Sequence, residues 1–309
     1  MNTADRKRIL VMMSTYNGEK YIRSQIDSIL SQKTEFGITL RIRDDGSTDN
    51  TCAVIEEYTT RYPNNVELIK GHNIGCNASF FSLLQNAEGY DFYSFSDQDD
   101  IWLSGKLQTA CKAIERVDAD IPVLYASVSH LVHDDLVPYG TTRKKERSFS
   151  MYNTIIQNIC PGHTQVMNEK LAELLRKPID TSRIYVYDSW ITNIANLYGK
   201  VLFDNHPHTY YRQYDGNQLG SGVGRLGQLI ASRKRISSGD GTKYRKQIEY
   251  FVEMNSAKLK EAGYYDEILS FIKADSFMKK IKYFTSSKLY RQTSLETSAF
   301  KAAVLLNRY

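Results

Sequence analysis

The chain has few prolines and glycines and no informative cysteine pattern. Among its 309 residues there are 6 prolines, 18 glycines and 4 cysteines. This composition excludes a low-complexity or disordered chain. The cysteine spacings match neither a zinc motif nor a disulfide framework, so we expect free thiols in a reducing compartment. The cysteines are Cys52, Cys76, Cys111 and Cys160.

Long apolar runs are also missing. The apolar run at residues 9–13 is much too short for the hydrophobic region of a signal peptide. No segment approaches the ~20 apolar residues of a membrane span. We therefore expect a cytoplasmic protein. Its net charge of +5 suits an anionic ligand such as a nucleoside diphosphate, or an anionic membrane surface, and is too small to indicate nucleic-acid binding.

Short apolar runs alternate with helical patterns through residues 8–130, which is typical of βαβ units in an α/β protein. Helical spacing of apolar residues is clear at Ile22, Ile26 and Ile29, and a helix is predicted over residues 106–117. The predicted strands of this part are residues 9–13, 40–43, 66–70, 91–96 and 123–128.

The remainder of the chain is less regular. Helices are predicted at 151–159 and 188–197, and short strands at 163–167, 201–203 and 209–212. Residues 215–227 are rich in glycine and are expected to form a mobile loop. From residue 229 onward the pattern is helical and basic.

Polar clusters follow three of the predicted strands, at residues 14–19, 44–49 and 96–100. Each cluster alone is compatible with a turn that caps the next helix. In an open α/β sheet, however, ligands bind outside the carboxyl ends of the strands. Together the clusters place at least five carboxylates along one edge, where their repulsion is costly unless a positive group lies between them.

The sharpest cluster has three carboxylates within four residues, from Asp97 to Asp100. Such a group predicts a hard divalent cation with oxygen ligands, Mg²⁺ or Mn²⁺. The ion would neutralise charge on a diphosphate leaving group. The alternative is an exposed acidic turn. Asp44 or Asp45 could accept a hydrogen bond from N3–H of uracil or thymine, and a capping role for them and for Ser47 is equally compatible with the sequence.

Taken together, the segments 14–19, 44–49 and 96–103 resemble the inverting family 2 glycosyltransferases of GT-A fold. Segments 187–190 and 210–217 resemble, more narrowly, bacterial rhamnosyltransferases of cell-wall and capsule assembly. The resemblance implies a GT-A-like α/β fold with a mixed central sheet flanked by helices and a C-terminal helical extension. It also implies a catalytic domain over 1–217, with a donor half at about 8–130 and an acceptor half at about 131–217. Residues 218–309 would form a loop and a helical region.

The resemblance assigns roles to single residues. Asp188 is the expected catalytic base, which deprotonates an acceptor hydroxyl, and Asp97 and Asp99 are the expected metal ligands. His163 and Trp190 are candidates for acceptor contacts, although Trp190 suits a core position as well. The expected donor-binding residues are Thr15, Tyr16, Asn17, Glu19, Asp44, Asp45, Asp97 and Arg212.

The sequence departs from the family pattern at one position. Relatives often carry a histidine two residues after the Tyr-Arg pair, and this chain has Tyr214 there. His206 or His208 could substitute as a metal ligand, and a structural role is the alternative. The segment 222–227 matches the dinucleotide-binding glycine pattern, but no strand precedes it, so we interpret it as a loop.

The implied activity is inverting transfer of a sugar, L-rhamnose from dTDP-rhamnose, to a hydroxyl of a bacterial polysaccharide precursor, either a free or a lipid-linked glycan. The implied cofactor is Mn²⁺ or Mg²⁺. A UDP-hexose or UDP-N-acetylhexosamine donor, and an inactive sugar-binding or scaffold protein, remain alternatives. A nucleotidyltransferase is disfavoured, because such an enzyme should carry a loop rich in glycine and lysine after its first strand. The corresponding loop in this chain, residues 14–19, is acidic. The basic C-terminal helices suggest either peripheral contact with the inner face of the plasma membrane or a homodimer surface.

Overall fold

The computed structural model describes residues 6–213 and 240–306. The strands are β1 (Arg8–Thr15), β2 (Gly37–Asp44), β3 (Val66–Lys70), β4 (Phe92–Ser96), β5 (Ile101–Trp102), β6 (Val123–Val132), β7 (Pro138–Thr141), β8 (Val166–Asn168) and β9 (Lys200–Arg212). The helices before residue 213 are α1 (Ile22–Leu30), α2 (Thr51–Arg61), α3 (Cys76–Gln85), α4 (Lys106–Ile114), α5 (Met151–Thr154), η2 (Gly162–Thr164), α6 (Glu169–Leu175), η3 (Thr181–Arg183) and α7 (Tyr187–Tyr198). The later helices are α9 (Asp240–Met254), α10 (Ser256–Glu261), α11 (Tyr265–Ile272), α12 (Phe277–Thr285) and α13 (Ser294–Leu305).

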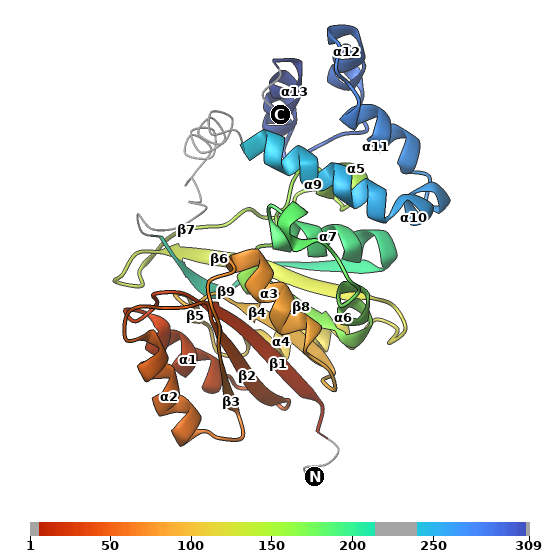
Figure 1. The fold of residues 1–309 in the computed structure, drawn as a ribbon. Helices are drawn as coiled ribbons and strands as arrows, with labels where there is room; N and C mark the ends of the chain where they lie inside the picture. Colours follow the sequence, from red (N-terminus) through yellow and green to blue (C-terminus); the bar gives the residue numbers. More distant parts are fainter. Residues whose placement is uncertain (1–5, 214–239, 307–309) are drawn as a thin grey trace.

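One mixed sheet has the order β3-β2-β1-β4-β8-β6-β9-β5, with β7 paired to β6 (Figure 1). Strands β3, β2, β1 and β4 are parallel, as the βαβ pattern predicts. Strand β8 runs antiparallel to both of its neighbours, β4 and β6. The mixed central sheet expected from the sequence is therefore confirmed, and the carboxyl ends of β1, β2 and β4 share one edge.

Strand β1 is buried on both faces, and its side chains alternate between two cores. Ile9, Val11 and Met13 pack with the side chains of α1, α2 and α4. Leu10 and Met12 pack with those of α3, α6 and α7 on the opposite face. Because side chains alternate along a strand, an uninterrupted apolar run is what a strand covered by helices on both faces requires.

The C-terminal helices extend the second core and cover α7. The Trp190 ring of α7 stacks on Tyr250 of α9, with ring centroids 5.2 Å apart. The side-chain Oε1 of Gln247 on α9 accepts hydrogen bonds from the backbone N–H groups of Tyr185 and Val186, each at 2.8 Å. Helix α9 therefore fixes the segment that leads into α7, and the expected C-terminal helical extension is confirmed (Figure 1).

Several predicted boundaries were wrong. The strands predicted at 201–203 and 209–212 form one strand, β9, because the polar residues between them lie at a bulge in the pairing of β6 with β9. The helix predicted at 151–159 ends at Thr154, and the one predicted at 106–117 ends at Ile114. Tyr214 and the segments 215–227 and 222–227 lie outside the described residues. Among the described residues, no helix combines the length and apolarity needed to cross a bilayer.

Candidate active site

The loops that follow β1 and β2 are joined by side-chain hydrogen bonds. Asn17, which has a positive φ of 48°, donates its backbone N–H to Ser47 Oγ and accepts from the Thr48 N–H at its Oδ1. The Glu19 carboxylate accepts from the backbone and side-chain nitrogens of Asn50 at 3.2 and 2.8 Å. Asn17 and Glu19, two of the predicted donor-binding residues, therefore hold the two loops together.

Asp44 and Asp45 are almost fully buried and bond to backbone at the same edge. Asp44 Oδ2 accepts from the N–H groups of Gly46 and Ser47, and this turn needs glycine at Gly46, where φ is +86°. Asp45 accepts from the backbone N–H groups of residues 74 and 75 at 3.0 and 2.8 Å and is ion-paired with Arg43. Contact of either carboxylate with a nucleobase stays a prediction. The N-cap of α2 is Asn50, and Ser47 has no capping role.

Gln98 connects the acidic loop after β4 to the loop after β1. Its Oε1 accepts from Thr15 Oγ1 at 2.5 Å and from the Tyr16 N–H at 2.9 Å. A Cβ on Gly18 would overlap the Gln98 amide, so glycine permits this close approach. Tyr16 stays 47% exposed beside the acidic loop that its backbone N–H contacts.

The acidic loop meets His163 of η2 beyond the end of β4. One ligand atom each from Asp97, Asp100 and His163 lies within 4.8 Å of the others. His163 Nδ1 is 3.7 Å from Asp97 Oδ2 and 3.8 Å from Asp100 Oδ2. The predicted metal ligand Asp97 and the predicted acceptor residue His163 are therefore close together. Asp100, rather than Asp99, completes this group.

Ser129 and Tyr211 fix the position of the His163 ring. Its Nε2 is 2.8 Å from Ser129 Oγ of β6, and its ring lies on Tyr211 with centroids 4.5 Å apart. Burial, with the Lys106 charge nearby, lowers the pKa of the imidazole to about 3, so the ring is neutral. In the tautomer that donates Nε2–H to Ser129, the Nδ1 lone pair faces the two carboxylates and is available to a metal.

The carboxylates of this cluster resist ionisation. Partial burial, together with the charges of Asp99 and Asp188, raises the pKa of Asp97 to about 7. Asp100 is fully buried, and the backbone N–H of Arg212 stabilises its carboxylate only weakly, because neither oxygen meets the geometry of a full hydrogen bond. Burial, together with Asp99 and Asp97, raises the pKa of Asp100 well above its usual value. Because buried carboxylates need a counter-charge or hydrogen bonds, these residues fit a divalent cation.

Lys106, the first residue of α4, lies close enough to Asp100 and His163 for its charge to affect both. It is fully buried, and its ammonium sits 3.4 Å from the centroid of the Trp102 ring. Burial lowers the pKa of Lys106 to about 7, while the charge of Asp100 opposes this shift. Lys106 therefore offsets part of the negative charge of Asp100.

Asp188 approaches the same cluster from the first turn of α7. Its Oδ2 accepts a hydrogen bond from the Gly162 N–H at 3.1 Å. Its charge contributes to the raised pKa of Asp97. A Cβ on Gly162 would overlap the Tyr187 hydroxyl, so glycine is required beside α7. The structure thus brings the predicted base and the predicted metal ligands to one place.

The short strand β5 pairs antiparallel with β9 and brings the end of β9 beside the acidic loop. Arg212 at this end is buried, donates from Nη1 to the Asp134 carbonyl at 3.4 Å, and has its guanidinium 4.9 Å from the centroid of the Tyr21 ring. Its backbone N–H lies against the Asp100 carboxylate, whereas its guanidinium is directed to Asp134 and Tyr21, so contact of Arg212 with the donor phosphates stays a prediction.

Three residues considered in the sequence lie elsewhere. Trp190 is 2% exposed and packs in the core, as described above, so the core interpretation holds and we assign it no acceptor contact. His206 Nδ1 and His208 Nε2 both bind the Asp204 carboxylate, at 2.8 and 2.9 Å. This arrangement agrees with their structural interpretation.

Sequence reasoning missed several residues that build the site, including Gln98, Ser129 and Lys106. Lys106 opens a helix in an ordinary amphipathic pattern, and Ser129 lies within an apolar strand, so neither carries a local signal. Asp100 was part of the acidic cluster but was not singled out. Its burial depends on the β5–β9 pairing, which sequence periodicity does not reveal.

Comparison with known proteins adds to this geometry. A family model described as Glycosyl transferase family 2 matches residues 10–181. The dTDP-rhamnosyl transferase RfbG of Shigella flexneri is 29% identical over 250 residues, which is 76% of this chain and 82% of RfbG. The minor teichoic acid biosynthesis protein GgaA of Bacillus subtilis is 34% identical over 122 residues, which is 37% of this chain and 27% of GgaA.

Solved structures show the same fold. S. aureus TarS 1–349 in complex with UDP-GlcNAc superimposes with a TM-score of 0.57 at 18% identity, covering 98% of this chain and 89% of that one. The mannosyltransferase PcManGT of Pyrobaculum calidifontis, in complex with GDP-Man and Mn²⁺, gives a TM-score of 0.52 at 15% identity over 98% and 87% of the two chains. With more than half of its length matched by the family model, this chain belongs to glycosyltransferase family 2 and has a GT-A-like fold.

Proposed function

We propose that the protein is a metal-dependent inverting glycosyltransferase that moves L-rhamnose from dTDP-rhamnose to a hydroxyl of a bacterial polysaccharide precursor. The observation that carries the reaction type is the meeting of Asp188 with the acidic cluster after β4. The similarity to the dTDP-rhamnosyl transferase RfbG over most of both chains supports the donor.

Asp188 would act as the general base. Inversion by single displacement needs one base on the face of the sugar opposite the leaving diphosphate. The acceptor oxygen forms a bond to the anomeric carbon as the bond from that carbon to the diphosphate oxygen breaks, and the acceptor proton passes to the Asp188 carboxylate. The Gly162 N–H, which bonds to Asp188 Oδ2, orients this carboxylate.

Asp97, Asp100 and His163 would hold the cation, with Asp99 of the same loop close to it. When bound, a divalent metal stabilises the negative charge that develops on the leaving diphosphate. The set contains an imidazole nitrogen, whereas Mg²⁺ prefers an all-oxygen octahedron, so we propose Mn²⁺ as the preferred ion. Arg212 and the exposed Tyr16 would contact the donor phosphates and base.

A UDP-N-acetylhexosamine donor is the second candidate. It is favoured by the fold shared with TarS, whose structure contains UDP-GlcNAc. An inactive scaffold does not account for the convergence of Asp188 with the cluster.

A thermal-shift panel tests the proposal, because a ligand that binds only the folded state raises Tm by mass action. The panel contains dTDP-rhamnose, UDP-GlcNAc, dTDP, UDP and GDP, each with Mn²⁺, Mg²⁺ or EDTA. We expect the largest shift with dTDP-rhamnose and Mn²⁺, and release of dTDP on addition of acceptor. A larger shift with UDP-GlcNAc would select the second donor. No shift with any nucleotide would refute the proposal.

A further inference from the structure

Helix α12 lies on the side of the C-terminal helices that faces away from the central sheet (Figure 1), and it carries an exposed apolar face. Phe277 and Met278 are 65% and 74% exposed, and Phe284 is 45% exposed. With the half-buried Ile281, Phe277 and Phe284 follow the i, i+4, i+7 spacing of one helix face. Large side chains that gather on one face of a short helix mark an interaction surface rather than scattered surface residues.

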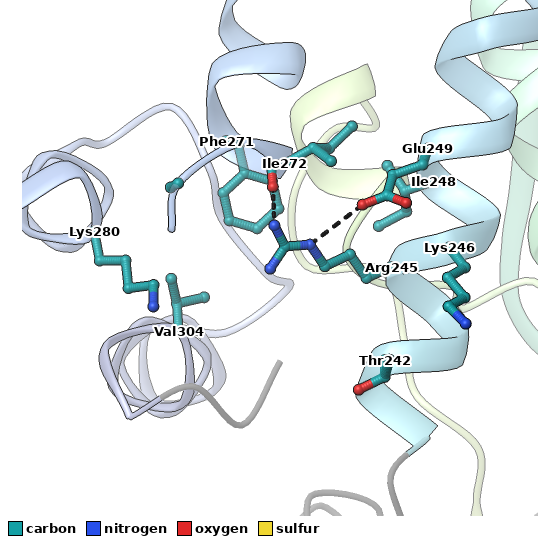
Figure 2. A pocket seen from close by; sticks show the side chains of 10 residues that line it. Thr242, Arg245, Lys246, Ile248, Glu249, Phe271, Ile272, Lys280 and Val304 are labelled. Atoms are coloured by element: carbon teal, nitrogen blue, oxygen red, sulfur yellow. Dashed lines mark hydrogen bonds and ion pairs between the residues drawn. The ribbon is translucent and has the colours of Figure 1, made fainter. Parts of the chain in front are cut away.

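A neighbouring side of α12 is already packed. Tyr283 is buried against Phe271, with ring centroids 5.3 Å apart. Lys280 is 7% exposed and points inward toward Val304 of α13, where both border a cavity of about 310 Å³ between α9, α12 and α13 (Figure 2). These contacts fix the orientation of α12, so the helix cannot rotate to bury its exposed apolar face.

The charges around this face have one dominant sign. From residue 273 to residue 288 there are five lysines and one aspartate, although Lys280 is buried and Lys288 is ion-paired with Glu267 at 3.2 Å. Lys282 is exposed on α12, and Lys279 is exposed and ion-paired with Asp275 at 2.9 Å. An apolar helix face with lysines along it is the pattern of a helix that lies in the interface of an anionic membrane.

We propose that α12 docks the protein on an anionic lipid bilayer, with Phe277, Met278 and Phe284 entering the interface and Lys279 and Lys282 contacting lipid phosphates. A second copy of the chain is a poorer occupant. A two-fold contact would bring together two surfaces that carry the same positive charge. A nine-residue helix is also only about 14 Å long at 1.5 Å per residue, which is short for the ~800 Å² per partner of a stable interface.

The proposal is independent of the donor and the reaction. Its test is co-sedimentation of the full chain with vesicles of phosphatidylcholine alone, or of phosphatidylcholine with phosphatidylglycerol at 3:1, at low and high salt. We expect at least tenfold stronger partition to the anionic vesicles, weakened by salt. The double variant K279Q/K282Q should lower that partition about 30-fold, because each basic residue contributes about 1 kcal/mol near the surface and 1.4 kcal/mol is a factor of ten.

Two further double variants test whether membrane binding depends specifically on the exposed face of α12. F277S/F284S should lower partition at least tenfold, since it removes two apolar anchors. The matched control K258Q/K260Q makes the same charge change on α10 and should retain partition within about threefold. Unchanged Tm of each variant and an unchanged Tm shift with dTDP and Mn²⁺ would show that the fold and the donor site are intact.

Equal binding to neutral and anionic vesicles would overturn the proposal, as would an equal loss in the α10 control. If the protein binds no vesicle, sedimentation velocity shows whether it is a dimer. A wild-type dimer that becomes a monomer in F277S/F284S would assign the face to a second copy and refute membrane docking. A monomer that binds no vesicle would refute it as well.

Discussion

Replacement of Asp100 by asparagine is expected to stabilise the metal-free protein even though it alters the active site. The Asp100 carboxylate is fully buried beside Asp97 and Asp99, and burial and these two charges outweigh the stabilising effect of the Arg212 backbone N–H and the Lys106 charge. An unsatisfied buried polar group costs about 1–3 kcal/mol, and more when it is charged. Asparagine has the same shape and no charge, and its amide keeps part of the polar cost. We therefore expect a gain of about 1–2 kcal/mol at pH 8 in EDTA, or about 2–6 °C in Tm.

The sign should reverse when metal is present. A cation at 100 times its Kd stabilises the wild-type fold by about 2.7 kcal/mol through mass action. Asp100→Asn removes one ligand of the group and should lose most of that shift. The measurement is calorimetric Tm of both proteins in EDTA and in MnCl₂. Asp204→Asn is a matched control, because that carboxylate is hydrogen-bonded to His206 and His208 and its loss should destabilise the protein in both buffers. The reasoning is refuted if Asp100→Asn lowers Tm in EDTA and keeps the full Mn²⁺ shift.

Three other predictions follow from the site. Asp188→Asn should lower kcat about 100-fold or more, because it removes the base, and should leave the Tm shift caused by dTDP and Mn²⁺ unchanged. Normal turnover in a steady-state assay would exclude Asp188 as the base. Gly162→Ala should destabilise the protein by about 1–3 kcal/mol in urea unfolding, because the new Cβ overlaps the Tyr187 hydroxyl, and an unchanged midpoint would contradict the packing described here. The pKa of Asp97 is raised to about 7 against about 3.9 in an unfolded chain, so between these pH values the folded state keeps a proton that the unfolded state has lost. Its contribution to the free energy of unfolding therefore falls as the pH rises through this range. Asp97→Asn should flatten that part of the profile in EDTA, and an identical profile would argue against the shift.

The donor side of the site could be predicted from the sequence to a large extent. Parallel strands of an α/β sheet end at the same edge, so polar clusters after β1, β2 and β4 had to meet there. The hydrogen bonds that the side chains of these clusters make at that edge were less predictable. Asn17 and Glu19 bond to the neighbouring loop, and Asp44 and Asp45 bond to backbone N–H groups, because short polar side chains at turns bond locally wherever they can.

The acceptor side required the fold. His163 lies next to the acidic loop because the antiparallel strand β8 follows η2 and pairs with β4. Asp100 is buried because β5 pairs with β9. Both contacts join segments far apart in the chain, and hydrophobic periodicity reports only on local structure. The same limit explains why the bulged strand β9 was predicted as two strands.

Calorimetric titration of dTDP into the wild-type protein, with Mn²⁺ and again with EDTA, tests the central claim most directly. The claim is that the edge formed by β1, β2 and β4 binds a nucleoside diphosphate through a divalent cation. We predict that Mn²⁺ strengthens binding of dTDP at least tenfold, which is 1.4 kcal/mol, and that Asp100→Asn removes this gain. Equal affinity in Mn²⁺ and in EDTA would contradict a metal-dependent donor site, whatever the activity of the protein.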